Sequence, residues 1–278
     1  MIHPVDAEVA PGVITNLLVI PPGQTGRATS EIERPPVVVS LHGGPRPPLD
    51  PGEVIARAEP WIDEGFAFYA VDYRASEVLG RDAAEASLSG ADLLGAGHDA
   101  GDAIAAIHAL AGSELAGLVD MTSMILHGFS YGAYVLNRWL VDGEPLGGVR
   151  LAVCQEGVAD LRTMDDASVA IQAARRGCRP EEDPEHWALA SPIDRASQVE
   201  VPVLLAYGDR SPAYGQGAAW REALAAAGNR SFWHEAAGEG HVFSPAADRA
   251  LAVAVTSAWR QLDSGVGRAG TSGTNALK

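Results

Sequence analysis

The feature that most constrains this chain is the stretch GFSYG at residues 128–132, a Gly-x-Ser-x-Gly pattern between two segments of different character. Residues 121–127 (MTSMILH) are rich in side chains that favour a buried strand, and residues 133–141 carry Ala, Leu, Val and Trp at helical spacing. Ser130 is therefore predicted to lie where a strand turns sharply into a helix. Such a turn exposes the hydroxyl, and the flanking glycines let the strand and the helix approach each other.

Strand-like and helix-like segments alternate along most of the chain. The apolar segments are short and continuous, which is typical of strands that are buried on both faces of a parallel sheet. We therefore predict an α/β fold with a mostly parallel central sheet and helices on both of its faces. Strands are expected near residues 12–20, 36–41, 66–73, 121–127, 148–155, 201–208 and 231–235, and helices near 53–64, 98–110, 133–141, 216–227 and 244–262.

The length of the chain, 278 residues, is sufficient for one large domain, which we place at residues 1–262. The polar, helix-like segment 160–198 lies between two predicted strands, and it is a candidate for a small helical cap over the site. Residues 263–278 (DSGVGRAGTSGTNALK) are rich in Gly, Ser and Thr, so we expect a disordered tail there.

Charge and composition argue against several classes of function. The chain has 36 acidic and 20 basic side chains, a net charge of −16, so it offers no basic footprint for nucleic acid or an anionic membrane. No long apolar run predicts a membrane span, and the N-terminus has no signal-peptide pattern, so a cytoplasmic location is expected. The histidines are dispersed, and Cys154 and Cys178 match no ligand spacing. We therefore expect no metal and no cofactor.

A serine at a strand-to-helix turn is a candidate nucleophile, and a base must then remove its proton. In a fold of this kind the nucleophile, the acid and the histidine follow one another in the sequence. His241 lies in the Gly-rich stretch AAGEGHVFSP, after the strand at 231–235 and before the last helix, and is the candidate base. His127 directly precedes the first glycine of the turn and is expected to be a packed strand histidine.

A carboxylate behind the histidine would fix its tautomer and stabilise the imidazolium ion. We expect it just beyond the strand at 201–208, where Asp209 is the first carboxylate and the next one is Glu222. Asp209 is therefore the candidate acid. Asp160, which follows the preceding strand, is the alternative.

Backbone N–H groups that face the developing negative charge would complete the site. One of them belongs to Tyr131, the residue after the serine. The other is expected from the loop after an early strand, where the sequence LHGGP stands at residues 41–45. Gly44 is the favoured donor of this oxyanion hole, with Gly43 and His42 as alternatives.

Together these residues resemble the α/β-hydrolases, and among them the catalytic domain of the prolyl oligopeptidase-like (S9) serine peptidases. The matching stretches occur in the family's order and cover most of residues 36–262: LHGGP (41–45), VDYRAS (71–76), HGFSYGA (127–133), ASPIDRASQVEVPVLLAYGD (190–209) and GEGHVF (238–243). The resemblance implies a hydrolase that cleaves peptides, amides or esters with a Ser–Asp–His triad. By position, Ser130 is the nucleophile and His241 the base, and Tyr131 and Gly44 are the backbone donors.

Three departures from the family pattern bear on this expectation. The family has Gly-x-x-Asp after the strand, where this chain has YGDRSP. Counting forward from Gly208 leads to Ser211, whereas counting back from the YGQG stretch of the next helix leads to Asp209 and retains a carboxylate. The residue after Ser-Tyr-Gly is Ala133 in place of glycine. The sequence has no counterpart of the N-terminal β-propeller of many such peptidases, so access to the site is expected to depend on residues 160–198 or to be uncontrolled.

The sequence thus predicts a cytoplasmic serine hydrolase, of peptidase or esterase type, that forms an acyl-enzyme at Ser130 with a peptide or small-molecule substrate. Two alternatives stay open. An amine could capture the same acyl-enzyme, as in an acyl transferase or a peptide-cyclising enzyme. A non-catalytic binding protein on a hydrolase scaffold is favoured by the irregular acid loop alone, and the intact turn at Ser130, the loop of His241 and the HGGP stretch count against it.

Overall fold

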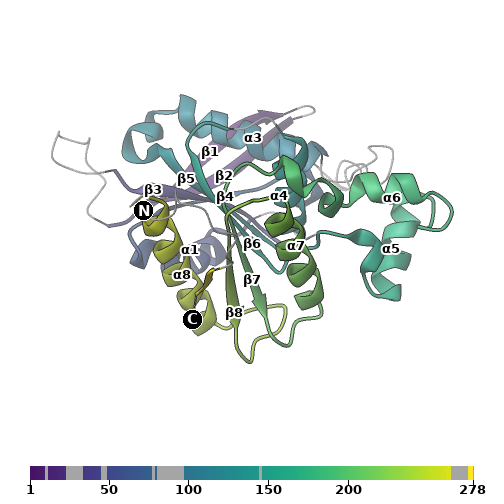
Figure 1. Cartoon of the computed structure of the whole chain (residues 1–278). Coiled ribbons are helices and arrows are strands. Elements are labelled where there is room, and N and C mark those ends of the chain that lie inside the picture. The colour runs from purple at the N-terminus through teal and green to yellow at the C-terminus, as the bar shows by residue number, and fades with distance from the viewer. Residues whose placement is uncertain are drawn as a thin grey trace.

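The computed structural model describes residues 1–9, 12–22, 34–44, 49–76, 79, 97–143, 146–263 and 275–277. Its centre is a nine-stranded sheet with the order β1-β2-β4-β3-β5-β6-β7-β8-β9 (Figure 1). β1 and β2 pair antiparallel, β2 is antiparallel to β4, and the remaining pairs are parallel. The strands are β1 (Ile2–Val9), β2 (Gly12–Val19), β3 (Pro36–Leu41), β4 (Ala67–Val71), β5 (Asp120–Phe129), β6 (Val149–Gln155), β7 (Val203–Gly208), β8 (Ser231–Ala236) and β9 (Asn275–Leu277). The predicted α/β fold with a mostly parallel sheet is confirmed.

Strand β1 has no counterpart in the sequence prediction. It pairs with β2 along its whole length, and only Val5 and Ala7 turn buried side chains to the core. Pro4 and the charged Asp6 and Glu8 interrupt the apolar pattern, as an edge strand tolerates because one of its sides has no partner strand. A half-buried edge strand therefore lacks the continuous apolar run that identified the central strands.

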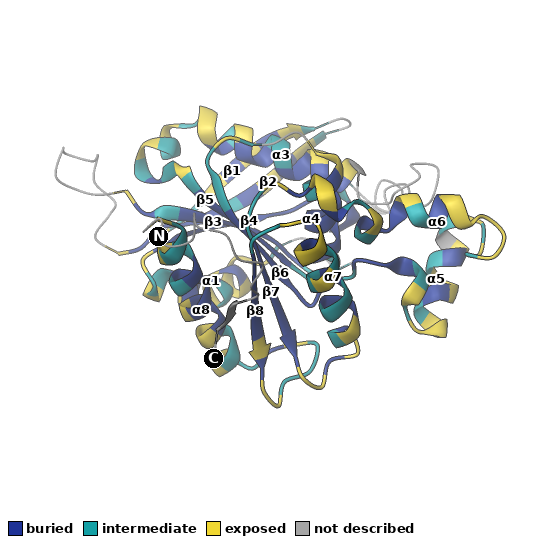
Figure 2. Ribbon diagram, in the orientation of Figure 1, coloured by how far each residue is buried: buried dark blue, intermediate teal, exposed yellow. Residues whose placement is uncertain are grey.

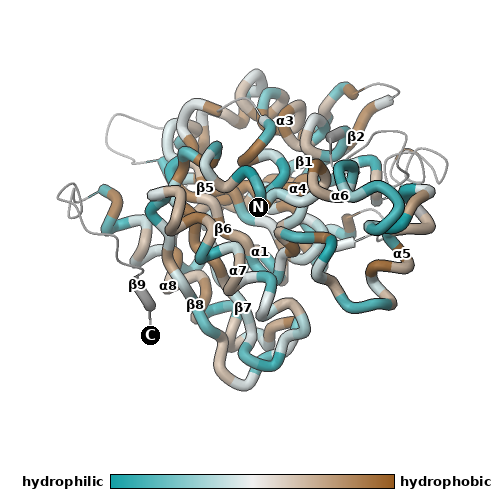
Figure 3. The backbone as a smooth tube through the Cα atoms, turned by 45° about the vertical axis from the view of Figure 1, so that its right-hand side comes forward, coloured by the Kyte–Doolittle hydropathy of each residue, from teal (hydrophilic) through white to brown (hydrophobic). Residues whose placement is uncertain are grey.

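Two layers of helices cover the sheet. One layer consists of α1 and α8, whose apolar side chains pack with Phe68, Ile125 and Leu204 of the central strands. The other consists of α3, α4 and α7, which pack with Val39, Leu126 and other residues of the opposite sheet face. Figure 2 shows the central strands buried and the outer helix faces exposed, and Figure 3 shows hydrophobic residues gathered along the same strands. The bounds are α1 (Pro51–Asp63), α3 (Gly97–Gly112), α4 (Tyr131–Asp142), α7 (Tyr214–Ala226) and α8 (Pro245–Asp263), with short 3₁₀ helices η1 (Arg74–Ser76) and η2 (Glu114–Leu118).

The segment between β6 and β7 is helical, and its helices α5 and α6 project to the side of the sheet (Figure 1). It contains η3 (Leu161–Thr163), α5 (Asp166–Arg176), α6 (Pro184–Ala190) and η4 (Pro192–Gln198). The fully buried Trp187 anchors α6, and its indole N–H donates to the Cys178 carbonyl over 3.3 Å. At the start of α5, Asp165 accepts hydrogen bonds from the backbone N–H groups of Ala167 and Ser168, as a helix N-cap does. We call residues 160–198 the cap segment.

Part of the C-terminal tail lies in the sheet. Residues 264–274 and 278 of the tail that was predicted to be disordered lie outside the described residues. Asn275–Leu277 forms β9, which pairs in parallel with β8. In the described ranges, no helix is long and apolar enough to cross a membrane.

Candidate active site

Ser130 sits at the junction of β5 and α4, as the sequence predicted, in a strained backbone conformation. Its φ of 53° and ψ of −116° are values that residues with a side chain rarely adopt. Its backbone is held on both sides, because its N–H donates to the Gln155 carbonyl over 2.9 Å and its carbonyl accepts from the Tyr134 N–H over 3.1 Å. The turn therefore fixes the backbone of the serine between the end of β5 and the start of α4.

The two glycines of the turn are required by close backbone contacts. A Cβ atom on Gly128 would lie 2.5 Å from the Gly132 carbonyl oxygen, and a Cβ on Gly132 would lie 2.3 Å from the Leu41 carbonyl oxygen. Ordinary contacts of this kind begin at about 3.4 Å, so no larger residue fits at either position without a shift of the backbone. The Gly-x-Ser-x-Gly pattern is thus the sequence signature of a strand, a helix and the loop after β3 packed backbone to backbone.

His241 faces the serine from the loop between β8 and α8. Its Nε2 lies 2.8 Å from the Ser130 Oγ, a distance suited to a hydrogen bond and to proton transfer. The Phe129 ring lies beside the imidazole, with 5.5 Å between the ring centres. Two residues separated by 111 positions in the sequence are therefore brought within hydrogen-bond distance of each other.

The carboxylate behind His241 is Glu156, which the sequence analysis did not single out. Its Oε2 lies 3.3 Å from the His241 Nδ1, and its side chain is fully buried. Oε1 accepts the Gly208 N–H over 2.7 Å, and Oε2 also accepts the hydroxyl of Ser211. The signal in the sequence was a carboxylate directly after the end of β6, because parallel strands place their carboxyl ends along one edge of the sheet.

The structure does not bring Asp209, the predicted acid, to the histidine. Asp209 is exposed at the end of β7, and its Oδ1 accepts the Gly238 N–H over 2.8 Å. It is turned toward the loop that precedes His241 and away from the imidazole edge that Glu156 occupies. The alternative acid, Asp160, is also engaged elsewhere, in a 2.7 Å ion pair with Arg162 of the cap segment.

The predicted oxyanion-hole residues lie next to the serine. Tyr131 is the first residue of α4 and directly follows Ser130, so its backbone N–H lies at the N-terminus of this helix beside the serine. A Cβ on Gly43 would lie 3.2 Å from the Ser130 Cβ, so the backbone of the loop after β3 lies next to the serine. Gly44 lines the cavities on both sides of Ser130.

A buried polar cluster fixes the loop that carries these glycines. The imidazole Nδ1 of His42 lies 2.7 Å from the Gly43 carbonyl, and its Nε2 lies 3.2 Å from Asp72 Oδ1. Asp72 also accepts the Leu49 N–H over 3.0 Å, and the Tyr73 ring stacks on His42 with 4.4 Å between centres. Burial alone would raise the pKa of Asp72, but the hydrogen bonds and charge of His42 together with Ser76 and Leu49 hold that pKa below its usual value.

His127 is packed within the sheet. Its Nδ1 lies 3.0 Å from the Ser40 hydroxyl and its Nε2 lies 3.0 Å from the Gln155 side-chain oxygen. Gln155 can only accept at that oxygen, so Nε2 carries the proton and Nδ1 accepts from the serine. Burial lowers the pKa of His127 to about 4, which keeps the ring neutral at physiological pH.

Two cavities meet at Ser130 and His241. One, of about 560 Å³, lies between the sheet and the α1–α8 layer. The other, of about 360 Å³, lies beneath the cap segment. The first is lined by Arg57, Trp61, Phe68, Phe129, Gln155, Asp248 and Leu251 among others, and the second by Tyr131, Tyr134, Val158, Leu161, Met164, Gln172 and Gln216 among others. A group attached to Ser130 would thus have space on two sides.

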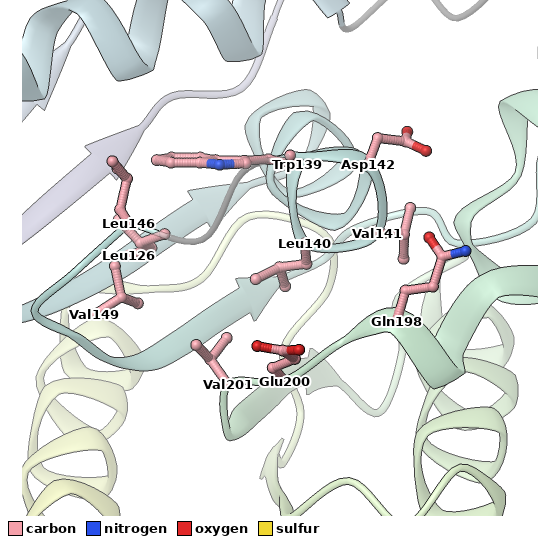
Figure 4. A pocket seen from close by; sticks show the side chains of 11 residues that line it. Leu126, Trp139, Leu140, Val141, Asp142, Leu146, Val149, Gln198, Glu200 and Val201 are labelled. Atoms are coloured by element: carbon pink, nitrogen blue, oxygen red, sulfur yellow. The ribbon is translucent and has the colours of Figure 1, made fainter.

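Another cavity, of about 280 Å³, lies near the start of β6 and away from Ser130 (Figure 4). Apolar side chains such as Trp139, Leu140 and Val201 surround it, together with Asp142 and Glu200. Asp142 forms ion pairs with the guanidinium groups of Arg138 and Arg195 and so serves the packing of α4. None of the residues that line this cavity is a serine, cysteine or histidine. Within the described part of the chain, no three His, Cys, Asp or Glu side chains gather as metal ligands would.

Comparison with known proteins shows the family of this chain. Residues 53–262 match the model of the prolyl oligopeptidase family. Solved structures with the same fold include an acylaminoacyl peptidase from Pyrococcus horikoshii (17% identity, TM-score 0.76, 94% of this chain covered) and a puromycin-hydrolyzing peptidase from Mycobacterium tuberculosis (23%, 0.74, 100%). A mutant of puromycin hydrolase is 26% identical, with a TM-score of 0.74 over 99% of this chain.

This chain spans 41% of the length of each of these three solved structures. No curated protein sequence matches it. The family model nevertheless covers residues 53–262, and that range contains Ser130, Glu156 and His241. The chain therefore belongs to the prolyl oligopeptidase (S9) family of serine peptidases.

Proposed function

We propose that this protein is a serine hydrolase that cleaves amide or ester bonds of peptide-like substrates through an acyl-enzyme on Ser130. The observation that carries the proposal is the 2.8 Å separation of the Ser130 Oγ and the His241 Nε2 at the strained turn between β5 and α4. A serine hydroxyl becomes a good nucleophile when a base at this distance accepts its proton.

In the proposed reaction the Ser130 Oγ attacks the carbonyl carbon while its proton moves to the His241 Nε2. The carbonyl oxygen becomes negative and is stabilised by the Tyr131 N–H and by an N–H of Gly43 or Gly44. His241 then gives its proton to the leaving amine or alcohol as the bond to the carbonyl carbon breaks. These steps leave the acyl group as an ester on Ser130. A water molecule then attacks the acyl carbon while one of its protons moves to His241, and His241 returns a proton to the Ser130 oxygen as the ester bond breaks, which releases the acid.

The two cavities beside the serine support a substrate that extends on both sides of the scissile bond. Each is lined by aromatic or aliphatic side chains with a few polar groups, as sites for organic ligands usually are. The solved relatives are described as acylaminoacyl peptidase and as puromycin hydrolase, and both descriptions denote enzymes that act on acylated amines. We therefore expect aminoacyl and peptidyl amides among the substrates of this chain.

The test is turnover of a panel of aminoacyl and peptidyl p-nitroanilides, the corresponding p-nitrophenyl esters, and puromycin. Wild-type protein should release product from members of the panel, and the Ser130→Ala and His241→Asn variants should lose that activity by about a thousandfold or more. Mass spectrometry of the products distinguishes hydrolysis, which yields a free acid, from transfer to an added amine. Turnover that persists in folded Ser130→Ala protein would refute the proposal.

A further inference from the structure

The ends of two neighbouring strands contribute the side chains behind His241. β6 and β7 are adjacent in the sheet (Figure 1). Glu156 directly follows β6, and Ser211 lies three residues beyond the end of β7. The Glu156 Oε2 accepts the Ser211 hydroxyl and lies 3.3 Å from the His241 Nδ1. We propose that Glu156, supplied from β6, is the positioning carboxylate of His241, and that Ser211 stands where a carboxylate from the β7 loop would otherwise reach the same point. This inference rests on the proposed function.

The neighbours of the Glu156 side chain are hydrogen-bond donors, and an ionised carboxylate can accept from all of them. Its oxygens meet the Gly208 N–H, the Ser211 hydroxyl and the imidazole edge of His241, and its side chain is fully buried. A carboxylate only accepts, so the His241 Nδ1 carries the proton and the Nε2 is free to accept the proton of Ser130. The buried negative charge would then stabilise the imidazolium ion that forms when Ser130 attacks.

The backbone at Glu156 shares an unusual positive φ with the backbone at Ser130. Among the described residues other than glycine, these two alone have a positive φ, 53° at Ser130 and 57° at Glu156. The Glu156 N–H is fixed to the Ala206 carbonyl of β7 over 3.0 Å. A Cβ on the next residue, Gly157, would lie 2.7 Å from the Ala133 Cβ, so the turn after β6 packs against the start of α4. Strain of this kind persists where a surrounding structure aims a side chain, and here both strained residues point to one histidine.

The test compares five variants by steady-state kinetics on the best substrate of the panel above: Glu156→Gln, Glu156→Asp, Glu156→Gln/Ser211→Asp, Asp209→Asn and Ser211→Ala. Glu156→Gln keeps the size of the side chain and removes its charge. We expect kcat to fall by about a thousandfold or more with little change in KM, because an amide N–H facing Nδ1 favours the wrong tautomer of His241. Asp209→Asn tests the competing assignment of Asp209 as the acid, and its kcat should stay within about threefold of the wild-type value.

Two readouts separate positioning of the imidazole from a structural effect. The acidic limb of the profile of kcat/KM against pH should move to lower pH in Glu156→Gln, because a neutral neighbour no longer stabilises the protonated imidazole. The double variant Glu156→Gln/Ser211→Asp returns a carboxylate from the β7 side and should recover at least about tenfold of the lost kcat. Glu156→Asp, which keeps the charge on a shorter side chain, should retain more activity than Glu156→Gln.

Reaction of wild type with a fluorophosphonate separates the two proposals. Inert wild type contradicts the proposed function, whereas reactive wild type with an unimpaired Glu156→Gln contradicts the role of Glu156 alone. If Glu156→Gln does not fold, the proton on the His241 Nδ1 decides the question by NMR. Its downfield resonance should be absent from His241→Asn, unchanged in Asp209→Asn and shifted in Ser211→Ala. A resonance, or an activity, that depends on Asp209 would overturn the inference.

Discussion

Replacement of Gly132 by alanine should damage both the stability and the catalysis of this protein. Gly132 is the second residue of α4, and a Cβ at this position would lie 2.3 Å from the Leu41 carbonyl oxygen and 2.5 Å from that of His42. Ordinary contact begins at 3.4 Å, so α4 and the loop after β3 must separate by roughly 1 Å. Overpacking of this kind costs about 1–3 kcal/mol, and the better helix propensity of alanine returns about 1 kcal/mol at most.

The net expectation for Gly132→Ala is a loss of about 1 kcal/mol in the free energy of unfolding, measured by denaturation in urea. The same displacement moves the backbone of His42 to Gly44, which faces Ser130. A shift of about 1 Å at such a position lowers kcat by about a hundredfold.

The matched control is Gly215→Ala. Gly215 is also the second residue of a helix, α7, but a Cβ there would have nothing within 4 Å. This variant should gain about 0.5–1 kcal/mol and keep its activity. A Gly132→Ala protein that matched Gly215→Ala in both stability and kcat would refute the reasoning that packing of the turn positions the oxyanion hole.

Two further predictions concern pH and substrate size. Folding lowers the pKa of His127 from 6.5 to about 4, so the unfolded chain binds a proton at this histidine more readily than the folded protein does. The contribution of His127 to the free energy of unfolding is therefore fully present above pH 6.5 and is lost as the pH falls to about 4. The decrease in the free energy of unfolding from His127 is about 3 kcal/mol, and His127→Gln should lack that part of the pH dependence when urea denaturation is followed across the same range. The second prediction concerns the cavity of about 360 Å³ beneath the cap segment. Gln172→Trp fills part of this cavity and should raise KM for the bulkiest members of the panel while leaving KM for the smallest unchanged. Equal KM changes across the panel would show that this cavity does not bind substrate.

The central strands and the position of Ser130 at a strand-to-helix turn could be predicted from the sequence because their signals are local. β5 and β7 are continuous apolar runs, and Ser130 is identified by glycines that only a tight turn requires. His241 was found by its place in a Gly-rich loop before the last helix. Each of these features depends on residues that are close together in the chain.

The carboxylate beside His241 could not be chosen from the sequence because the choice is made between two strands. The ends of β6 and β7 meet at the same edge of the sheet, so Glu156 and Asp209 were both within reach of the histidine in principle. Asp209 directly follows Gly208, where an added Cβ would lie 2.3 Å from the Glu239 carbonyl oxygen, and the Asp209 side chain accepts the Gly238 N–H. Glu156, which lies beside His241, has a backbone φ of 57°, and no local pattern in the sequence predicts that conformation.

The most direct test of the central claim, that His241 activates Ser130, is intact-protein mass spectrometry after reaction with a fluorophosphonate. The account predicts one adduct on wild type, located at Ser130 by peptide mapping, absent from Ser130→Ala and formed far more slowly by His241→Asn. Folded wild-type protein that forms no adduct, or one that His241→Asn forms at the wild-type rate, would contradict it.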